Sequence, residues 1–321
     1  MRRLFPFCCV ALLSLAVAGA ALAGNGGLAP PSPASPQAHD IRQIYWLILG
    51  VTAAIFILVE VTLAIFIVRY RSRGRAREVE GPQIRGHTNL ELAWTAGPVV
   101  ILAVITAFVL YKAAAIRNAP AGTPRDTIQI VAHQFYWEFV YPNGAVSVDT
   151  LRLPHNRRVD LEIRSADVAH SWWVPSLAGK MDAIPGRVNL LSFRAVKLGS
   201  FPGRCAEFCG LQHTDMTAQV EVLPPDRYDE FVRQRRVEPQ ALARETFEGV
   251  CAKCHGLAGQ GDIGPPIAGN TLLADPAALT LLLQQGRGKM PAVGKGWDET
   301  QLRATLAYLQ KRFRPGGTSG G

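Results

Sequence analysis

Residues 205–216 read Cys205-Ala-Glu207-Phe-Cys209-Gly-Leu-Gln-His213-Thr-Asp-Met216, and they place four soft or borderline metal ligands within twelve positions. Thiolate and thioether sulfur together with imidazole select copper, whereas zinc has little use for a thioether. A single blue-copper ion uses one Cys, two His and an axial Met, so this stretch contains one Cys more than that design needs. The pattern therefore favours two copper ions that share two sulfur bridges.

A second histidine has to come from elsewhere in the chain. The best candidate is His170, within residues 167–177, which read DVAHSWWVPSL. Two other interpretations remain at this point. A zinc site with two Cys and two His would leave Met216 as an ordinary packing residue, and an exported domain would tolerate a Cys205–Cys209 disulfide. Each of them leaves at least one of the ligands unexplained.

These two segments, with Asp182-Ala-Ile-Pro-Gly-Arg187, resemble subunit II of cytochrome c oxidase, and the resemblance extends over residues 40 to 225 or so. It implies a cupredoxin-like β-sandwich with a binuclear copper-A centre. The implied roles are bridging thiolates for Cys205 and Cys209, one imidazole per copper ion from His170 and His213, Met216 on one ion, and the backbone carbonyl of Glu207 on the other. The resemblance also implies that the Glu207 side chain reaches a magnesium ion shared with the catalytic subunit I.

The chain begins with the pattern of a cleaved secretory signal. Residues 1–23 carry Arg2 and Arg3, then an apolar run, then the small-residue ending Ala-Leu-Ala. Cys8 and Cys9 would leave with this signal, so four of the six cysteines remain in the mature chain. Residues 24–40 are rich in proline and predict a flexible segment.

Residues 41–116 predict a transmembrane helical hairpin with spans at 44–68 and 94–111. The intervening loop, 69–91, is rich in arginine, and the positive-inside rule places it in the cytoplasm. The N-terminal end and everything after the hairpin would then lie on the periplasmic side of a bacterial inner membrane. Part of the net charge of +9 lies in this loop, where it meets anionic lipid headgroups rather than nucleic acid.

Two acids belong to this hairpin. Glu60 lies inside the first span, where an ionisable group is a functional candidate by default and a contact with a neighbouring helix or subunit is the simpler interpretation. Glu91 stands at the cytoplasmic end of the second span, where an acid stabilises the helix dipole. The oxidase resemblance favours a further role for Glu91 at the entrance of a proton-uptake path.

Residues 121–224 predict the copper-A domain. Apolar and polar residues alternate over 127–132, 158–164, 188–193 and 218–223, which predicts short strands of a β-sandwich with the metal ligands on its loops. The aromatic run 132–139 resembles the strand through which electrons enter in the oxidase family. Many members have Trp where this chain has Phe135, so Phe135 and Trp137 are the entry candidates, and ordinary core packing is the alternative for each.

A charged linker, 225–240, precedes a second domain at 241–314. Its segment Cys251-Ala-Lys-Cys254-His255 is the C-x-x-C-H haem-attachment motif, with His255 at the spacing of a proximal ligand. Met290 is the candidate distal ligand, and residues 298–312 predict a closing amphipathic helix. The segment resembles a class I c-type cytochrome, an all-α domain. A zinc half-site is the alternative, but the second Cys pair that would complete it is missing. Residues 315–321 are expected to form a flexible tail.

The sequence thus predicts a multi-domain membrane protein: a transmembrane hairpin, a cupredoxin-like sandwich and an all-α cytochrome c domain. The resemblance implies subunit II of a bacterial haem–copper oxidase, with two copper ions, one covalent haem c and magnesium as cofactors. The implied partners are oxidase subunits I and III and a reduced respiratory cytochrome or bc-type complex, with oxygen reduction and proton pumping in subunit I. The alternatives are the electron-input subunit of a copper-A nitric oxide reductase and a copper-delivery protein, although copper delivery does not require a covalent haem.

Overall fold

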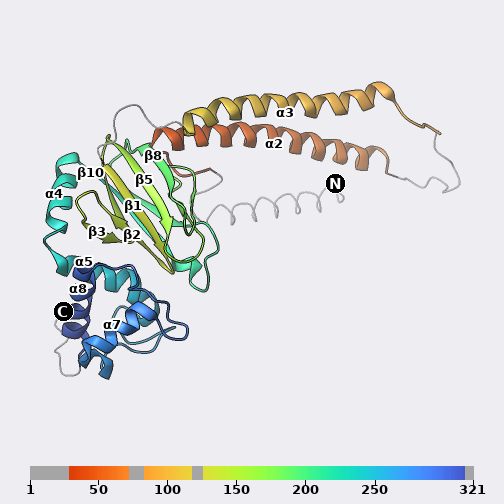
Figure 1. Ribbon diagram of the computed structural model, residues 1–321. Coiled ribbons are helices and arrows are strands. Elements are labelled where there is room, and N and C mark those ends of the chain that lie inside the picture. The colour runs from red at the N-terminus through yellow and green to blue at the C-terminus, as the bar shows by residue number, and fades with distance from the viewer. Residues whose placement is uncertain (1–28, 72–82, 118–125, 315–321) are drawn as a thin grey trace, which may run out of the picture. The chain divides into compact units, whose positions relative to one another are not determined.

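The computed structural model describes residues 29–71, 83–117 and 126–314 (Figure 1). The chain divides into two compact units, a helical one within 39–117 and a second that combines Ser32–Ala38 with the chain from Asn118 onward. The predicted secretory signal, residues 1–23, and the predicted tail, residues 315–321, lie outside the described residues.

The first unit contains the two long helices α2 (Pro36–Arg69) and α3 (Thr88–Arg117). Both are long and apolar enough to cross a membrane, and they contain the predicted spans 44–68 and 94–111. Lys112 Nζ on α3 forms an ion pair with Asp40 Oδ1 on α2 at 2.8 Å. Within this unit, therefore, the two helices lie side by side (Figure 1).

The two acids of the hairpin have different surroundings. Glu60 is exposed on α2. Glu91 lies in the first turn of α3, where its Oε1 accepts a hydrogen bond from the backbone N–H of His87 at 3.2 Å. A carboxylate that reaches back in this way satisfies an N–H that the helix itself leaves unpaired. Glu91 therefore caps its helix, and its role in proton uptake stays a prediction.

The second unit is built around a β-sandwich of two five-stranded sheets. The first sheet has the order β3-β2-β1-β5-β8 and consists of β1 (Asp126–His133), β2 (Tyr136–Val140), β3 (Val146–Val148), β5 (Arg158–Ser165) and β8 (Asn189–Arg194). The second has the order β4-β10-β9-β6-β7 and consists of β4 (Thr150–Pro154), β6 (His170–Trp173), β7 (Met181–Ala183), β9 (Gly199–Cys205) and β10 (Thr217–Leu223). The strands predicted from alternation correspond to β1, β5, β8 and β10, so that prediction is confirmed.

Aromatic side chains fill the space between the two sheets. Trp137 of β2 is fully buried, and its ring meets that of Trp172 edge to face with centroids 5.0 Å apart. Phe139 meets Trp172 in the same way at 5.5 Å. Edge-to-face pairs of this kind stabilise a core beyond their area burial. They join the strand that carries the aromatic run to the strand that carries His170.

Part of the segment predicted to be flexible, residues 24–40, is instead packed on the sandwich. The backbone N–H of Ala34 donates to the carbonyl of Ser176 at 2.7 Å, and Val196 donates to the carbonyl of Ala34 at 2.8 Å. The Ser35 hydroxyl donates to the carbonyl of Leu177. Backbone hydrogen bonds require no particular side chain, so the proline-rich composition gave no sign of them.

The predicted linker, residues 225–240, also differs from expectation, because most of it is the helix α4 (Pro225–Arg235). Tyr228, Phe231 and Val232 share one face at helical spacing and pack against the core of the sandwich. Asp229 accepts a hydrogen bond from Arg157 at 2.8 Å. The run of charges in this segment lies on a helix that belongs to the copper domain.

The C-terminal part is helical. Its elements are α5 (Pro239–Thr246), the π-helical turn η2 (Phe247–Cys251), α6 (Ala252–His255), the 3₁₀ turn η3 (Thr271–Ala274), α7 (Pro276–Gln285) and α8 (Glu299–Phe313). The closing helix predicted at 298–312 is α8, and the Asp298 side chain caps it by accepting from the Gln301 N–H at 2.7 Å.

This helical domain shares a hydrophobic core with the sandwich. Tyr136, Val146 and Val148 of β2 and β3 belong to the same buried cluster as Phe247, Leu309 and other side chains of the helical domain. We call this helical domain, residues 241–314, the haem domain. The Tyr136 hydroxyl donates to the carbonyl of Val293 at 2.8 Å and accepts from Trp297 Nε1 at 3.0 Å. The two domains predicted from the sequence are therefore packed together as one unit.

An acid is buried at the same junction. Glu138 of β2 is 6% exposed, and the side chain of Gln301 hydrogen-bonds its carboxyl group. The other carboxyl oxygen, Oε2, has no partner within the described part of the chain. Burial raises the pKa of Glu138 to about 7, against the opposing effects of Gln301 and Arg164.

We expect Glu138 to make the stability of this unit depend on pH. The carboxyl binds its proton more tightly in the folded chain than in the unfolded one, so stability decreases as the pH rises from about 4.5 to about 7. Over this pH range the free energy of unfolding decreases by roughly 3 kcal/mol. Glu138→Gln removes the ionisation, so the variant should match the unchanged chain below pH 4.5 and exceed it in stability above pH 7. Denaturant unfolding of the full chain at several pH values measures this, and equal differences at all pH values would contradict it.

Candidate functional site

The candidate metal ligands lie where three strands of the second sheet end. His170 begins β6, Cys205 ends β9, and Met216 precedes β10, so the segment 206–216 is the connection between two antiparallel neighbours. The backbone N–H of Cys205 donates to the carbonyl of Met216 at 2.9 Å, which closes this connection at its base. Ala206 donates to the carbonyl of Ser171 at 2.8 Å and joins it to β6. We call residues 205–216 the copper loop.

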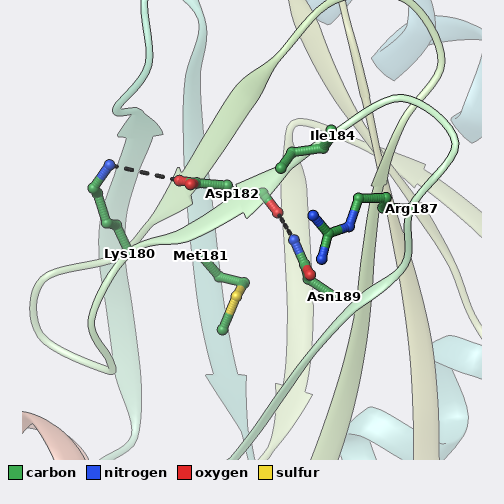
Figure 2. Close-up of a pocket in the computed structure, with 6 residues that line it drawn as sticks. All are labelled: Lys180, Met181, Asp182, Ile184, Arg187 and Asn189. Atoms are coloured by element: carbon green, nitrogen blue, oxygen red, sulfur yellow. Dashed lines mark hydrogen bonds and ion pairs between the residues drawn. The ribbon is translucent and has the colours of Figure 1, made fainter.

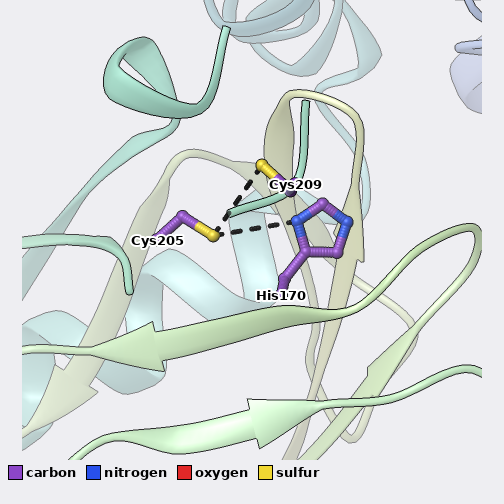
Figure 3. Close-up of side chains that lie close together, drawn as sticks. All are labelled: His170, Cys205 and Cys209. Atoms are coloured by element: carbon purple, nitrogen blue, oxygen red, sulfur yellow. Dashed lines mark hydrogen bonds between the residues drawn. The ribbon is translucent and has the colours of Figure 1, made fainter. Parts of the chain in front are cut away.

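Both thiols of the copper loop have an imidazole beside them. Cys205 Sγ lies 3.8 Å from His170 Nδ1, and Cys209 Sγ lies 3.6 Å from His213 Nδ1. The two sulfurs are 3.9 Å apart. Figure 3 shows both sulfurs together with the His170 ring. Met216 Sδ is 3.8 Å from Cys209 Sγ, and the carbonyl oxygen of Glu207 is 3.2 Å from Cys205 Sγ. The structure thus brings together all six predicted ligands.

These spacings fit a bound metal. Two donors that are each about 2.0–2.3 Å from one ion, at a tetrahedral angle, lie roughly 3.5–3.8 Å apart. The thiol–imidazole and thiol–thioether pairs of the copper loop have spacings of 3.6–3.8 Å. Within the part of the chain that the structure describes, His170, Cys205 and Cys209 form the cluster whose ligand atoms all lie within 4.8 Å of one another. Both cysteines are free thiols.

The acidity of the two thiols also points to a cation. Burial opposes ionisation of Cys205, but the His170 imidazole and backbone hydrogen bonds lower the pKa of this thiol to about 7. Burial and the charge on Cys205 raise the pKa of Cys209 to about 12. The protein alone therefore stabilises one thiolate here and not two. Metal cations between the sulfurs would supply the charge that lets both ionise.

Asp167 orients one of the imidazoles. Its Oδ1 lies 2.8 Å from His170 Nε2, and its Oδ2 accepts from the backbone N–H of Gln134 at 2.6 Å. A proton held on Nε2 leaves Nδ1, which faces Cys205, free to bind a metal. In the sequence, Asp167 is visible only as the first residue of the segment 167–177. An acid three residues before a candidate ligand was the available signal for this role.

The two electron-entry candidates have different environments. Trp137 is fully buried, with its ring edge-on to that of His170 at a centroid distance of 6.1 Å. Phe135 is half-buried, and its ring lies against Gly210 of the copper loop, where an added Cβ would be 3.2 Å from the ring. Both aromatic side chains therefore lie next to the candidate metal site, and only Phe135 is partly accessible.

A pocket of about 380 Å³ lies beside the copper loop (Figure 2). Lys180, Asp182, Arg187 and Asn189 are among the residues that line it. Lys180 Nζ lies 3.5 Å from Asp182 Oδ1 and 3.8 Å from Glu207 Oε2. Asp182 also accepts from the Ser171 hydroxyl at 2.8 Å, next to His170 in the chain. The Glu207 carboxylate is half-exposed at the edge of this group of charged side chains.

The haem-attachment motif forms the end of η2 and the helix α6. Cys251 and Cys254 are free thiols, and burial raises the pKa of both, that of Cys251 to about 12. His255 Nδ1 lies 2.6 Å from the carbonyl oxygen of Pro265, which leaves Nε2 free to bind iron. The His255 ring also lies so close to Gly264 that an added Cβ would be 2.7 Å from Cε1. The motif and its neighbouring loop are therefore shaped to hold one imidazole in a fixed orientation.

The surroundings of this motif suit an apolar group. Leu257 and Ile263 flank His255 and Gly264 in the chain, and they are 67% and 58% exposed. Two large apolar side chains left open beside a pair of thiols and an oriented imidazole fit a haem better than a zinc ion. Met290 is half-buried and packs against the core of this domain.

Comparison with known proteins gives three family matches along the chain. Residues 23–111 match the transmembrane domain of cytochrome c oxidase subunit II, and residues 145–223 match its periplasmic domain. Residues 238–309 match the family of cbb3-type cytochrome c oxidase subunit III.

Individual relatives agree with these matches. Cytochrome c oxidase subunit 2 of Alkalihalophilus pseudofirmus is 32% identical over 319 residues, which cover 89% of this chain and 91% of the relative. The corresponding protein of Cereibacter sphaeroides is 31% identical and covers 70% of this chain and 84% of its own length. Among solved structures, the periplasmic domain of subunit II of cytochrome oxidase from Bradyrhizobium japonicum is 27% identical, with a TM-score of 0.35, over 36% of this chain and 97% of its own.

The two apolar helices, the sandwich and the ligand cluster on its loops define a membrane-anchored, cupredoxin-like electron-transfer protein. A cytochrome c domain follows the sandwich in the same chain. The chain belongs to the cytochrome c oxidase subunit II family.

Asp167→Asn should weaken copper binding. An amide at this position can donate to His170 Nε2 and so favour the tautomer whose Nδ1 is protonated and unavailable to a metal. Loss of such a supporting carboxylate lowers metal affinity by about 10–100-fold. Competition with a graded series of copper chelators measures the effect on the full chain. Asp229→Asn, which changes an acid on α4 paired with Arg157, is the matched control, and equal copper retention by the two variants would contradict the role of Asp167.

Proposed function

We propose that this chain is the electron-input subunit of a bacterial haem–copper cytochrome c oxidase. A covalent haem c on Cys251 and Cys254, with His255 and Met290 as axial ligands, would receive electrons first. A binuclear copper-A centre on the copper loop and His170 would receive them next and pass them to subunit I. When bound, these two groups supply reversible one-electron oxidation and reduction.

One observation carries this proposal. Two thiols, two imidazoles, a thioether and a carbonyl converge at the copper loop and His170, and each imidazole lies beside a different sulfur. This division supports two metal ions with one imidazole each, because a single ion would need both imidazoles on the same side of the pair. The expected roles are Cys205 and Cys209 as bridges, His170 and His213 as one ligand each, and Met216 and the carbonyl oxygen of Glu207 as the outer ligands.

The protein holds these donors in place by its own hydrogen bonds. Asp167 orients His170, and Gln134 Nε2 donates to the carbonyl of Cys209 at 2.7 Å. The backbone of Cys205 is bonded to that of Met216. A site fixed in this way changes little in geometry between oxidation states, which favours rapid electron transfer.

The remaining expectations concern sidedness and partners. The arginines of 69–91 support a cytoplasmic loop by the positive-inside rule, so the copper and haem domains would lie in the periplasm. The half-exposed carboxylate of Glu207 would share a magnesium ion with subunit I at the pocket of Figure 2. Subunits I and III are the expected partners, a reduced cytochrome or bc-type complex is the expected donor, and proton uptake would begin near Glu91.

The relatives favour an oxidase over the two alternatives. Those of Alkalihalophilus pseudofirmus and Cereibacter sphaeroides are both named as cytochrome c oxidase subunit 2. A nitric oxide reductase would require a different catalytic partner. A copper-delivery protein would have no use for the haem-attachment motif.

Metal and haem content of two variants tests the proposal. The purified full chain should hold two copper ions in a mixed-valence electron paramagnetic resonance signal and one covalent haem. Cys209→Ser should lose the mixed-valence signal and keep the haem, because it removes one sulfur bridge. Cys254→Ser should reduce covalent haem attachment and keep the copper signal. Each variant is thus the control for the other, and a single copper or a zinc ion in the unchanged chain would overturn the binuclear assignment.

A further inference from the structure

The haem-attachment motif touches the copper loop directly through Gln212. This side chain is 3% exposed although it is polar. Its Nε2 donates to the backbone carbonyl of Lys253 at 3.3 Å, and its Oε1 accepts from Cys254 Sγ at 3.3 Å. Both ends of a buried amide on the copper loop are therefore satisfied by residues inside the haem-attachment motif.

One of these two contacts is independent of haem attachment. Addition of a thiol across a vinyl group transfers the S–H hydrogen to carbon, so Cys254 no longer donates once a haem is attached. The hydrogen bond from Gln212 to the Lys253 carbonyl involves no thiol and remains. That carbonyl belongs to the peptide bond with Cys254, and Gln212 is bonded to His213. A single hydrogen bond therefore completes a bonded route between Cys254 and His213.

The Lys253 side chain fixes the same junction from the other side. Its Nζ lies 2.5 Å from Asp149 Oδ2 and donates to the carbonyl of Phe135 at 3.0 Å. Asp149 is itself held by its Oδ1, which accepts from the Trp137 N–H at 2.8 Å. The side chains of Lys253 and Asp149 are 15% and 19% exposed. An ion pair as shielded as this one is screened less by salt than a surface pair, and removal of one partner leaves the other with an unpaired charge.

The two domains approach each other very closely here. A Cβ added to Gly249, just before the haem-attachment motif, would lie 2.7 Å from Val148 Cγ1 in β3. A Cβ added to Gly210 would lie 3.0 Å from Gln134 Nε2 and 3.2 Å from the Phe135 ring. Glycine at position 249 lets the haem domain approach the side chains of Val148 and Asp149, and glycine at position 210 lets the copper loop lie against Gln134 and Phe135 within its own domain.

We propose that Gln212 and Lys253 are positioning residues that dock the haem-attachment motif on the copper loop and carry the electron between the two sites. The electron would pass from the haem through the Lys253 carbonyl and the Gln212 side chain to the copper site. The haem site loses one electron and the copper site gains one, with no bond formed or broken and no proton transferred. This inference rests on the proposed function, since it requires both sites to be loaded.

Docking also determines where an external donor can bind. Tyr136, Val146 and Val148 of the copper domain are buried by the haem domain. Phe135, one of the two entry candidates, has its carbonyl engaged by Lys253 and its ring against Gly210. A soluble cytochrome therefore has access to the haem domain and not to this face of the copper domain.

Gln212→Leu tests the route, because leucine keeps the bulk of the side chain and removes both hydrogen-bonding groups. The Lys253 carbonyl then loses the hydrogen bond from Gln212. The lost free energy corresponds to about tenfold faster backbone hydrogen exchange around residues 251–255. In the full chain, a soluble photoreductant delivers one electron to the haem and optical absorbance follows its arrival at copper. Reduction of the haem by the photoreductant should keep its rate, and the transfer from haem to copper should slow several-fold.

Gln310→Leu is the matched control. Gln310 Nε2 donates to the carbonyl of Leu273 at 2.9 Å, so the same substitution removes the same kind of bond inside the haem domain. It should leave both the exchange around 251–255 and the haem-to-copper rate unchanged. If Gln212→Leu accelerates exchange but leaves that rate unchanged, the electron takes another route and the inference fails. It also fails if neither quantity changes.

Lys253→Met provides a second test at a distance from the copper ligands. It should accelerate exchange in the copper loop and slow transfer from haem to copper, with normal copper and haem spectra. Carbodiimide coupling gives a readout that needs no cofactor, because it joins a lysine to a carboxylate in contact. In the unchanged chain the Lys253–Asp149 peptide pair should be recovered by mass spectrometry, and its absence would overturn the docking. Missing copper or haem spectra in the unchanged chain would instead overturn the proposed function.

Discussion

The fold has to hold two buried sulfur atoms, those of Cys205 and Cys209, only 3.9 Å apart. Two thiolates at that distance repel each other strongly in a protein interior, so the pair is stable only with cations between or beside them. The chain meets this condition by geometry. The copper loop is closed at its base by the bond between Cys205 and Met216 and is joined to β6 by Ala206. The sulfurs, imidazoles and thioether are therefore held in position before any ion arrives.

The haem domain is part of the same construction. The two domains share a buried cluster, and the helix α4 that joins them is packed on the sandwich through Tyr228. Arg235 at the end of α4 pairs with Glu245 of α5, which also approaches Arg152 of β4. A flexible tether would give the two sites an effective concentration near the millimolar range at best. A shared core instead fixes one geometry, so the transfer does not depend on chance encounters.

The sequence predicted what depends on local pattern. Strands β1, β5, β8 and β10 followed from alternation, helix α8 from amphipathic spacing, and the candidate ligands from residue types that few other sites combine. Contacts between distant backbone groups left no comparable signal. Ala34 is joined to the sandwich by main-chain hydrogen bonds to distant residues, and Gln212 looked like a spacer between ligands. In α4, the many charged residues drew attention away from Tyr228, Phe231 and Val232, although these three residues have the spacing of one helix face. Asp167 was visible too, but its role depends on a side-chain direction that only the fold determines.

The apolar contribution of β2 and β3 to the shared cluster has a consequence for how this protein can be handled or can evolve. Tyr136 and Val148 are 0% and 2% exposed, and they lie in one buried cluster with haem-domain side chains. A gene truncated after β10 would encode a sandwich with an exposed apolar surface on β2 and β3. Such a protein would be prone to self-association and poorly soluble when expressed alone. Loss of the C-terminal domain by deletion would therefore have to be accompanied by polar substitutions on this face. The fusion is in that sense difficult to reverse, because each domain covers apolar side chains of the other.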